Sequence, residues 1–170
     1  SIEGNGRGLM KPVSKNVQSL SDENLETGAC LCGEMTTLPG TAHHREEGAY
    51  NLHMAMGLTD HVPPTTTRHE EGTATSMQAW KEGYKPLSSL RTGEKNVVKA
   101  TLAAAGKNAD KVRAKLEEGA VMQLVMNHND GHDGNILISE DGSDVQFIDH
   151  GATFGHAMYG GCSIVHSHMH

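Results

Sequence analysis

The stretch "HNDGHDGNILISEDGSDVQFIDHG", residues 128–151, places acidic and imidazole side chains on either side of two short apolar runs. The runs "NILI" and "VQFI" have the length and the apolar content of strands, and "SEDGSD" between them contains an Asp-Gly pair typical of a tight turn. The stretch therefore predicts an antiparallel β-hairpin flanked by polar loops. Such a hairpin brings Asn135, which precedes the first strand, close to Asp149, which ends the second.

The residues flanking this hairpin point to a particular chemistry. An amide oxygen beside a carboxylate suits magnesium, a hard cation that prefers oxygen ligands. Asp130 precedes Asn135 on the same loop, where its carboxylate could meet a substrate hydroxyl. Phosphoryl transfer needs metal ligands, a residue that orients the nucleophile, and a cation over the phosphates. The hairpin and its loops therefore predict a site for phosphoryl transfer.

Length, charge and cysteine content limit the class of protein. A chain of 170 residues allows one domain or two small lobes that share a cleft. The net charge of -7 argues against a general nucleic-acid binder. We find no apolar run long enough to span a bilayer and no signal-peptide pattern. Cys30, Cys32 and Cys162 cannot all pair internally, so we expect a reduced, cytoplasmic protein.

Upstream of the hairpin, apolar spacing and turn residues predict the order of elements. A glycine-rich loop leads into a short segment carrying Lys11, and a long loop is expected over residues 14–40. The next elements are a helix in "REEGAYNLHMAMGL" that stops near Gly57, an extended segment after "DHVPP", a strand in "GTATSMQAWKEG" and a short helix in "NVVKATLAAAG".

The strongest helical pattern runs from about residue 109 to residue 126. Its expected inner face consists of Val112, Leu116, Ala120, Leu124 and Val125. Its expected outer face consists mostly of Lys111, Arg113, Lys115, Glu117 and Glu118.

The motifs "DGHDGN" and "FIDHG" resemble the catalytic and metal-binding loops of atypical kinases, in particular the phosphatidylinositol 3/4-kinase-like group. These kinases carry an Asp-Arg-His-x-x-Asn loop, a strand pair and an Ile-Asp-x-Gly loop. The resemblance implies that Asp130 is the catalytic aspartate and His132 its partner. It also implies that Asn135 and Asp149 are ligands of Mg²⁺ or Mn²⁺ beside ATP. Gly131 departs from the pattern, because the family usually has arginine there.

The N-terminal half carries "MKPV", "REEGAY", "HVPPT" and "SMQAWKEG", in the order found in small bacterial proteins of this group. By this resemblance Lys11 contacts the ATP phosphates. Glu46 pairs with Lys11 from the helix, and Glu47 takes that place if the register slips by one residue. The glycine loop, with Gly6 and Gly8, would cover the phosphates.

The hinge implied by the resemblance takes the adenine through backbone groups between Met77 and Glu82. Its expected nucleotide-binding residues are Met77, Gln78, Ala79 and Trp80. We expect the Trp80 ring to serve first in core packing and second as a neighbour of the adenine.

The expected fold is α+β, a minimal two-lobe arrangement similar to protein kinases. Residues 1–82 would form an N-lobe with a small sheet and one helix, and residues 83–170 a reduced helical C-lobe carrying the catalytic hairpin. The expected activity is transfer of the γ-phosphate of ATP to a hydroxyl, with a protein Ser/Thr favoured over a lipid. A bacterial effector delivered into the host cytoplasm, where a host protein completes the reduced C-lobe, fits this resemblance.

Two other functions remain open from the sequence. A metallohydrolase could bind zinc or a pair of ions, using His128, Asp130, His132, Asp149 and His150. That function leaves Asn135 and Lys11 without a role. A pseudokinase or binding module could keep the fold without turnover. The terminal "HSHMH" could bind a transition metal, although we interpret it as a disordered tail.

Overall fold

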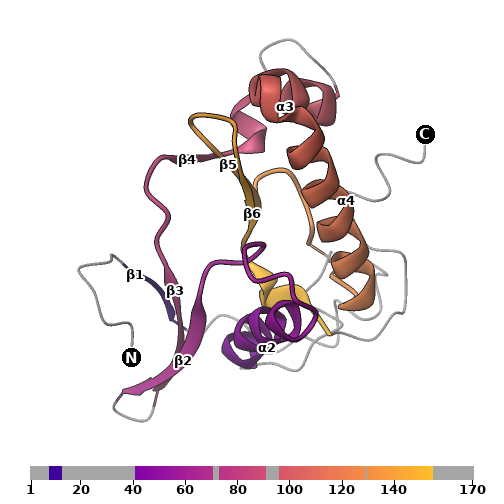
Figure 1. Cartoon of the computed structure of the whole chain (residues 1–170). Coiled ribbons are helices and arrows are strands. Elements are labelled where there is room, and N and C mark those ends of the chain that lie inside the picture. The colour runs from indigo at the N-terminus through magenta and orange to yellow at the C-terminus, as the bar shows by residue number, and fades with distance from the viewer. Residues whose placement is uncertain (1–7, 13–40, 71–72, 91–95, 129, 155–170) are drawn as a thin grey trace, which may run out of the picture.

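The computed structural model of the chain describes residues 8–12, 41–70, 73–90, 96–128 and 130–154. The described residues form a mixed helix and strand structure, which confirms the α+β class. The predicted long loop at 14–40, Gly6, the three cysteines and the histidine-rich tail lie outside these residues. Figure 1 shows two small sheets, with one helix beside the first sheet and a longer helix alongside the second.

The first sheet has the strand order β1-β3-β2, with all pairs antiparallel. Its strands are β1 (Gly8–Pro12), β2 (Thr65–Glu70) and β3 (Thr73–Ala79). The strand expected in "GTATSMQAWKEG" is therefore present as β3, at the centre of this sheet. Threonine is abundant in β2 and β3 because its β-branched side chain packs well on a pleated surface.

Helix α2 (Ala42–Ala55) lies against β2 and β3 and confirms the helix predicted in this region. It ends where the sequence indicates, because Gly57 has φ +78° and reverses the chain at little steric cost. The N–H of Leu58 then donates to the carbonyl of His53, which closes the end of the helix.

The second sheet has the order β4-β5-β6 and contains the predicted hairpin. It is formed by β4 (Tyr84–Pro86), β5 (Ile136–Ser139) and β6 (Val145–Phe147). In the turn, Gly142 has φ +66°, and Asp141 accepts hydrogen bonds from the side chains of Ser139 and Ser143. Residues 80–83 connect the first sheet to the second. The expected division into two lobes after residue 82 stays a prediction.

Two helices cover the second sheet, and both were predicted. Helix α3 (Val97–Ala105) is capped by Asn96, whose side chain accepts the N–H of Lys99. Helix α4 (Ala109–Val125) follows a short 3-10 turn, η3 (Gly106–Asn108). Two further 3-10 turns are η2 (Leu87–Leu90) and η4 (His150–Ala152). The main core lies between the sheet and these helices and includes Val62, Leu87, Val112, Ile136, Ile138, Val145 and Phe147.

The inner face predicted for α4 is partly wrong. Val112 is buried, but Leu124 and Val125 are 62% and 61% exposed, whereas Lys115, predicted outside, is 7% exposed. The predicted stripe advanced by four residues at a time, and each such step drifts about 40° around a helix with 3.6 residues per turn. The observed buried face alternates steps of three and four and passes through Gly119, which lies against Phe147.

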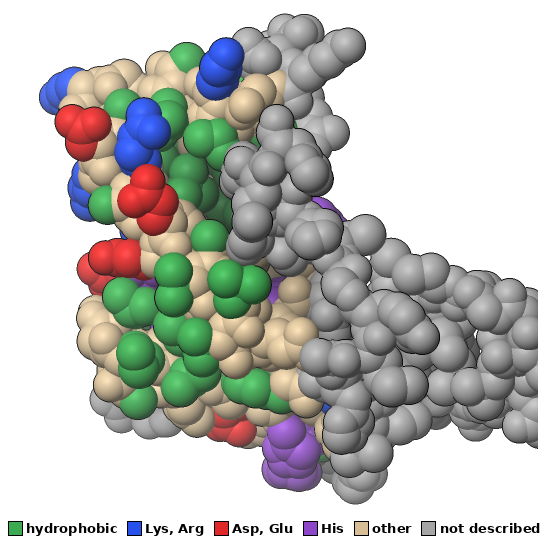
Figure 2. Space-filling view, turned by 90° about the vertical axis from the view of Figure 1, so that its right-hand side faces the viewer, with side chains coloured by type: hydrophobic (Ala, Val, Ile, Leu, Met, Phe, Trp, Pro, Cys, Tyr) green, Lys and Arg blue, Asp and Glu red, His purple; other side chains and the backbone are tan. Residues whose placement is uncertain are grey.

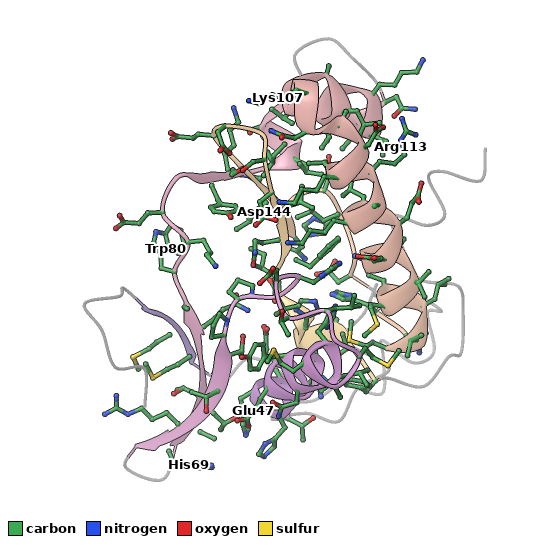
Figure 3. The ribbon with its side chains drawn as sticks, in the orientation of Figure 1. Glu47, His69, Trp80, Lys107, Arg113 and Asp144 are labelled. Carbon is green, nitrogen blue, oxygen red and sulfur yellow. The ribbon has the colours of Figure 1, made fainter. Side chains whose placement is uncertain are left out.

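Lys115 is buried because its ammonium group has partners inside the protein. Its Nζ lies 2.6 Å from Asp144 Oδ1 and 2.6 Å from the carbonyl oxygen of Asp60. Asp144 also accepts hydrogen bonds from Tyr84 and Gln146. Burial acts against ionisation, but these hydrogen bonds hold the pKa of Asp144 below its ordinary value. Asp144 therefore joins the hairpin to α4 (Figure 3).

Over the described residues, the helices are all too short or too polar to pass through a lipid bilayer.

Candidate functional site

The hairpin brings the two polar loops together at its open end. The N–H of Ile148 donates to the carbonyl of Asn135 over 2.9 Å, one residue beyond the pair formed by Ile136 and Phe147. Asn135 therefore lies opposite Ile148 in the hairpin, and Asp149 is the next residue after Ile148. This is the juxtaposition that the sequence predicted from the strand and turn pattern.

The loop before β5 is held by Asn135, which is 9% exposed. Its side-chain Nδ2 donates to the carbonyl of Asp130 over 3.0 Å, and its backbone N–H donates to the carbonyl of His132. Because the amide nitrogen is used in this way, Oδ1 is the atom that Asn135 can offer to a cation. The side chain thus stabilises the loop and presents an oxygen.

Asp130 and His132 lie at the surface of this loop. The Oδ1 atom of Asp130 is 3.7 Å from Nε2 of His132, and the two side chains are 45% and 51% exposed. The Nδ1 atom of His132 accepts the N–H of Gly134, so a neutral imidazole carries its proton on Nε2, facing the carboxylate. A pair this exposed adds little to stability, but it is accessible to a substrate.

Gly131, where the related kinases usually have arginine, packs against α4. A Cβ atom at this position would lie 2.7 Å from Oε1 of Gln123, which is 5% exposed. A larger residue would have to displace the Gln123 side chain. The absence of a side chain at Gly131 therefore allows this loop to approach α4 closely.

Asp149 adopts a left-handed backbone conformation, with φ 61° and ψ 61°. A non-glycine residue in this region is strained, and such strain persists where surrounding contacts hold it. Two side chains of α2 supply these contacts. Glu46 Oε2 accepts the N–H of His150 over 3.1 Å, and Arg45 Nε donates to the carbonyl of Gly151.

The position of Glu46 bears on its predicted pairing with Lys11. Glu46 is 3% exposed, and its carboxylate is directed at the loop after β6. The backbone of Lys11 pairs with Ser76 in the first sheet, but its side chain lies outside what the structure describes. The pairing of Glu46 with Lys11 therefore stays a prediction.

Glu47, the alternative partner for Lys11, faces β2 instead. Its Oε1 accepts a hydrogen bond from Thr66 over 3.2 Å. Burial acts in the opposite direction, but hydrogen bonds from Thr67 and Thr66 leave the pKa of Glu47 below its ordinary value. Glu47 thus holds α2 to the first sheet (Figure 3). Glu46 holds α2 to the loop at Asp149.

His128 has a role that the sequence did not reveal. The ring is 3% exposed, and its Nδ1 accepts the N–H of Asp130 over 3.2 Å. A second hydrogen bond joins the ring to the backbone of Asp149. Burial lowers the pKa of His128, although this hydrogen bond and the nearby carboxylates oppose it. His128 therefore ties the loop of Asp130 to the loop of Asp149. Its spacing of two residues from Asp130, a distance over which a side chain reaches a backbone N–H, was the available signal.

Further buried histidine rings lie next to His128. The His150 ring centroid is 5.3 Å from that of His128 and 5.8 Å from that of His53, which lies 6.2 Å from His61. His61 in turn stacks on Phe147 at 6.2 Å. Burial lowers the pKa of His53 and of His61, so these rings are neutral at neutral pH. His150, which is 1% exposed, is thus a core residue.

In the parts of the chain that the structure describes, no three His, Cys, Asp or Glu side chains are grouped so that they could hold a metal ion. His128 and His150 are buried in the imidazole core, whereas His132 is at the surface. This arrangement does not favour the zinc site considered from the sequence. Asn135 and Asp149, which offer oxygen, remain the candidate metal ligands.

The predicted hinge residues lie at the end of β3, beside β1. Ala79 pairs with Gly8, Gln78 with Leu9 and Met77 with Met10. The end of the glycine-rich segment thus runs next to the hinge strand. Gln78 is buried, and its Nε2 donates to Thr65 over 3.0 Å.

The expectation that Trp80 packs in the core is wrong. The ring is 52% exposed, because Trp80 follows the last paired residue of β3, where the chain leaves the first sheet (Figure 3). The role of Trp80 as a neighbour of the adenine stays a prediction.

The sequence matches no known family model, and the search of curated proteins finds no relative.

Proposed function

We propose that this protein is an ATP-dependent phosphotransferase with a minimal two-lobe kinase-like fold, as its resemblance to the phosphatidylinositol 3/4-kinase-like group implies. The observation that carries the proposal is the hydrogen bond between Ile148 and Asn135. Because of this hydrogen bond, Asn135 and Asp149 lie on the two arms of the hairpin, at its open end. Asn135 would offer an amide oxygen to a metal, and Asp149 would offer a carboxylate.

Asn135 and Asp149 would hold Mg²⁺ or Mn²⁺. Both side chains offer oxygen, which these hard cations prefer, and Asn135 has already committed its nitrogen to Asp130. The metal supplies neutralisation of charge on the nucleotide phosphates. Glu46 and Arg45 fix the backbone that follows Asp149, so the carboxylate is held in place before a ligand arrives.

The remaining roles follow from positions along the same loops. Asp130, accessible at the surface, orients the acceptor hydroxyl, and His132 beside it donates from Nε2. Lys11 contacts the phosphates, and the backbone of Met77–Trp80 takes the adenine beside Gly8. The acceptor we favour is Ser or Thr of a protein, with a host protein as partner for a delivered effector.

Substitution of Asp149 by asparagine tests this function. Asp149→Asn keeps the size of the side chain but replaces a charged carboxylate with a neutral amide that has a single acceptor oxygen. Metal-dependent ATP binding and phosphotransfer should therefore be lost, while the melting temperature stays close to that of the parent. The measurements are calorimetry of ATP with Mg²⁺ and transfer of labelled phosphate to a general protein acceptor.

Asp141→Asn is the matched control, because Asp141 is an exposed aspartate in the turn of the same hairpin. It should leave binding and transfer unchanged. Phosphotransfer at the parental rate by Asp149→Asn would contradict the metal assignment. Binding of ATP and Mg²⁺ without transfer to any acceptor would instead identify a binding module.

Metal analysis separates this function from a zinc hydrolase. An oxygen-only site binds Mg²⁺ tightly only with nucleotide phosphates present, whereas a nitrogen-rich site retains zinc without nucleotide. The terminal "HSHMH" has to be removed first, since it could bind zinc by itself. Stoichiometric zinc in the trimmed protein, with no heat on adding ATP and Mg²⁺, would refute the kinase assignment.

A further inference from the structure

The connection between α2 and β2 is held to the second sheet and its long helix by two backbone carbonyls. The carbonyl of His61 accepts the N–H of Phe147 in β6 over 2.8 Å. The carbonyl of Asp60 accepts hydrogen bonds from Lys115 of α4 and from Gln146 of β6, each over 2.6 Å. We call Asp60 and His61 the junction residues, because they join this connection to α4 and β6.

The ring of His61 is buried at this junction. It is 6% exposed and stacks on Phe147, and its Nε2 atom lies 2.9 Å from Oε2 of Glu118. We place the proton of the neutral ring on Nε2, facing this carboxylate. The Nδ1 atom is buried and has no hydrogen-bond partner among the residues that the structure describes. Figure 2, which views the molecule from the side of α4, shows histidine in the middle of this face as small areas between other side chains.

Burial and the charged groups around the ring decide its protonation. Burial lowers the pKa of His61, and Lys115 of α4 acts in the same direction. Glu118 of α4 and Asp144, which precedes β6, act in the opposite direction. From α2, the ring of His53 lies 6.2 Å away between centroids, and a positive charge on one of these two imidazoles opposes a charge on the other. The closed junction therefore holds His61 in its neutral form.

A second proton on the ring would sit on Nδ1, for which the described residues offer no acceptor. An unpaired buried donor is costly, and the new charge would also lie near the ammonium group of Lys115. We propose that His61 is a pH-dependent switch, in which the neutral ring keeps the junction residues on α4 and β6 and protonation releases them. The switch is independent of phosphotransfer, because neither junction residue belongs to the proposed site.

The size of the effect follows from the linkage between protonation and release. In an opened junction the ring reaches water and takes up a proton around its ordinary pKa of 6.5, whereas in the closed junction it does so only at lower pH. The opened form therefore binds more protons below about pH 6.5, and opening does not depend on this group above that pH. Between pH 7.5 and pH 5.5 the equilibrium constant for opening should rise severalfold, to a limit of about tenfold.

Hydrogen exchange at two neighbouring amides of the full chain tests the switch. The N–H of Phe147 donates to the carbonyl of His61, so its exchange reports release of the junction residues. The N–H of Ile148 donates to the carbonyl of Asn135 within the hairpin and is the matched control. Opening constants are obtained at pH 7.5 and pH 5.5 from exchange rates corrected for the chemical exchange of each amide. The constant should rise severalfold at Phe147 and less at Ile148, and an equal rise at both would overturn the proposal.

Substitution of His61 identifies the titrating group. His61→Gln removes the imidazole and keeps a side-chain N–H that can face Glu118. In this variant the opening constants at Phe147 and Ile148 should respond equally to acid. If Phe147 still responds more strongly than Ile148, a group other than His61 is responsible and the switch is wrongly assigned.

A second variant changes a half-exposed side chain and should fold even if His61→Gln does not. Glu118→Gln removes the carboxylate that favours the charged ring, so the acid response at Phe147 should be at least as large as in the parent. Glu117→Gln, at the adjacent exposed position of α4, is its matched control and should keep the parental response. A smaller response in Glu118→Gln than in Glu117→Gln would refute the switch.

Discussion

Gly119 should be the residue of α4 at which a single added methyl group does most harm. A Cβ atom there would lie 2.0 Å from Cζ of Phe147 and 2.4 Å and 2.5 Å from its Cε atoms. Phe147 is 2% exposed and has His61 stacked on its ring, so it cannot simply move away. We therefore predict that Gly119→Ala is destabilising, against the usual effect of this substitution in a helix.

The size of the effect follows from two opposing contributions. Replacing glycine by alanine inside a helix stabilises by about 1 kcal/mol. Overpacking a close-packed core costs up to about 3 kcal/mol, and three contacts far below van der Waals distance place Gly119 at that end. The net loss should be about 2 kcal/mol. For a protein of this length it should lower the melting temperature by roughly 4–8 °C.

Thermal unfolding of Gly119→Ala beside Gly48→Ala measures this prediction. Gly48 lies inside α2, where an added Cβ would meet only Phe154 at an ordinary 3.5 Å. The same substitution should therefore stabilise the protein by about 1 kcal/mol at Gly48. If both variants melt higher than the parent, the packing of Phe147 against α4 is not as described, and the reasoning fails.

Lys115→Met should cost about 3 kcal/mol, because it leaves the Asp144 carboxylate without its cation. A double-mutant cycle with Asp144→Asn, followed by chemical denaturation, should show positive coupling, and additive effects would contradict the pairing. Acid should also destabilise the fold. Burial lowers the pKa of His53, His61 and His128, so the folded state binds fewer protons than the unfolded one. Stability should be constant above about pH 6.5 and fall below it, as melting curves from pH 8 to pH 5 would show.

Local patterns were enough to predict the hairpin and most helices. The Asp-Gly pair, the two apolar runs and the flanking polar residues act over short distances, and they placed Asn135 beside Asp149. The end of α2 at Gly57 and the position of α3 were predictable for the same reason. Each depends on residues that are neighbours in the sequence.

Contacts between distant residues could not be predicted in the same way. The sequence shows Lys115 as a charge on a helix, and its burial depends on Asp60 and Asp144, which come from other elements. Likewise, the hydrogen bond from His150 to Glu46 joins residues that no local pattern relates. The exposure of Leu124 and Val125 follows from which side of α4 meets Phe147, and that side is set by Gly119.

The backbone conformation of Asp149 has a consequence for the order of folding. Its two supports, from Glu46 to His150 and from Arg45 to Gly151, close loops of 104 and 106 residues. Contacts of such separation carry a large loop-closure entropy and form slowly compared with the local hairpin. The hairpin should therefore assemble early with an unsupported loop, and the left-handed turn at Asp149 should appear only in the final step. Pulse-labelling of amide hydrogens during refolding should then find the N–H of His150 protected later than the N–H of Ile148, which donates to the carbonyl of Asn135 within the hairpin.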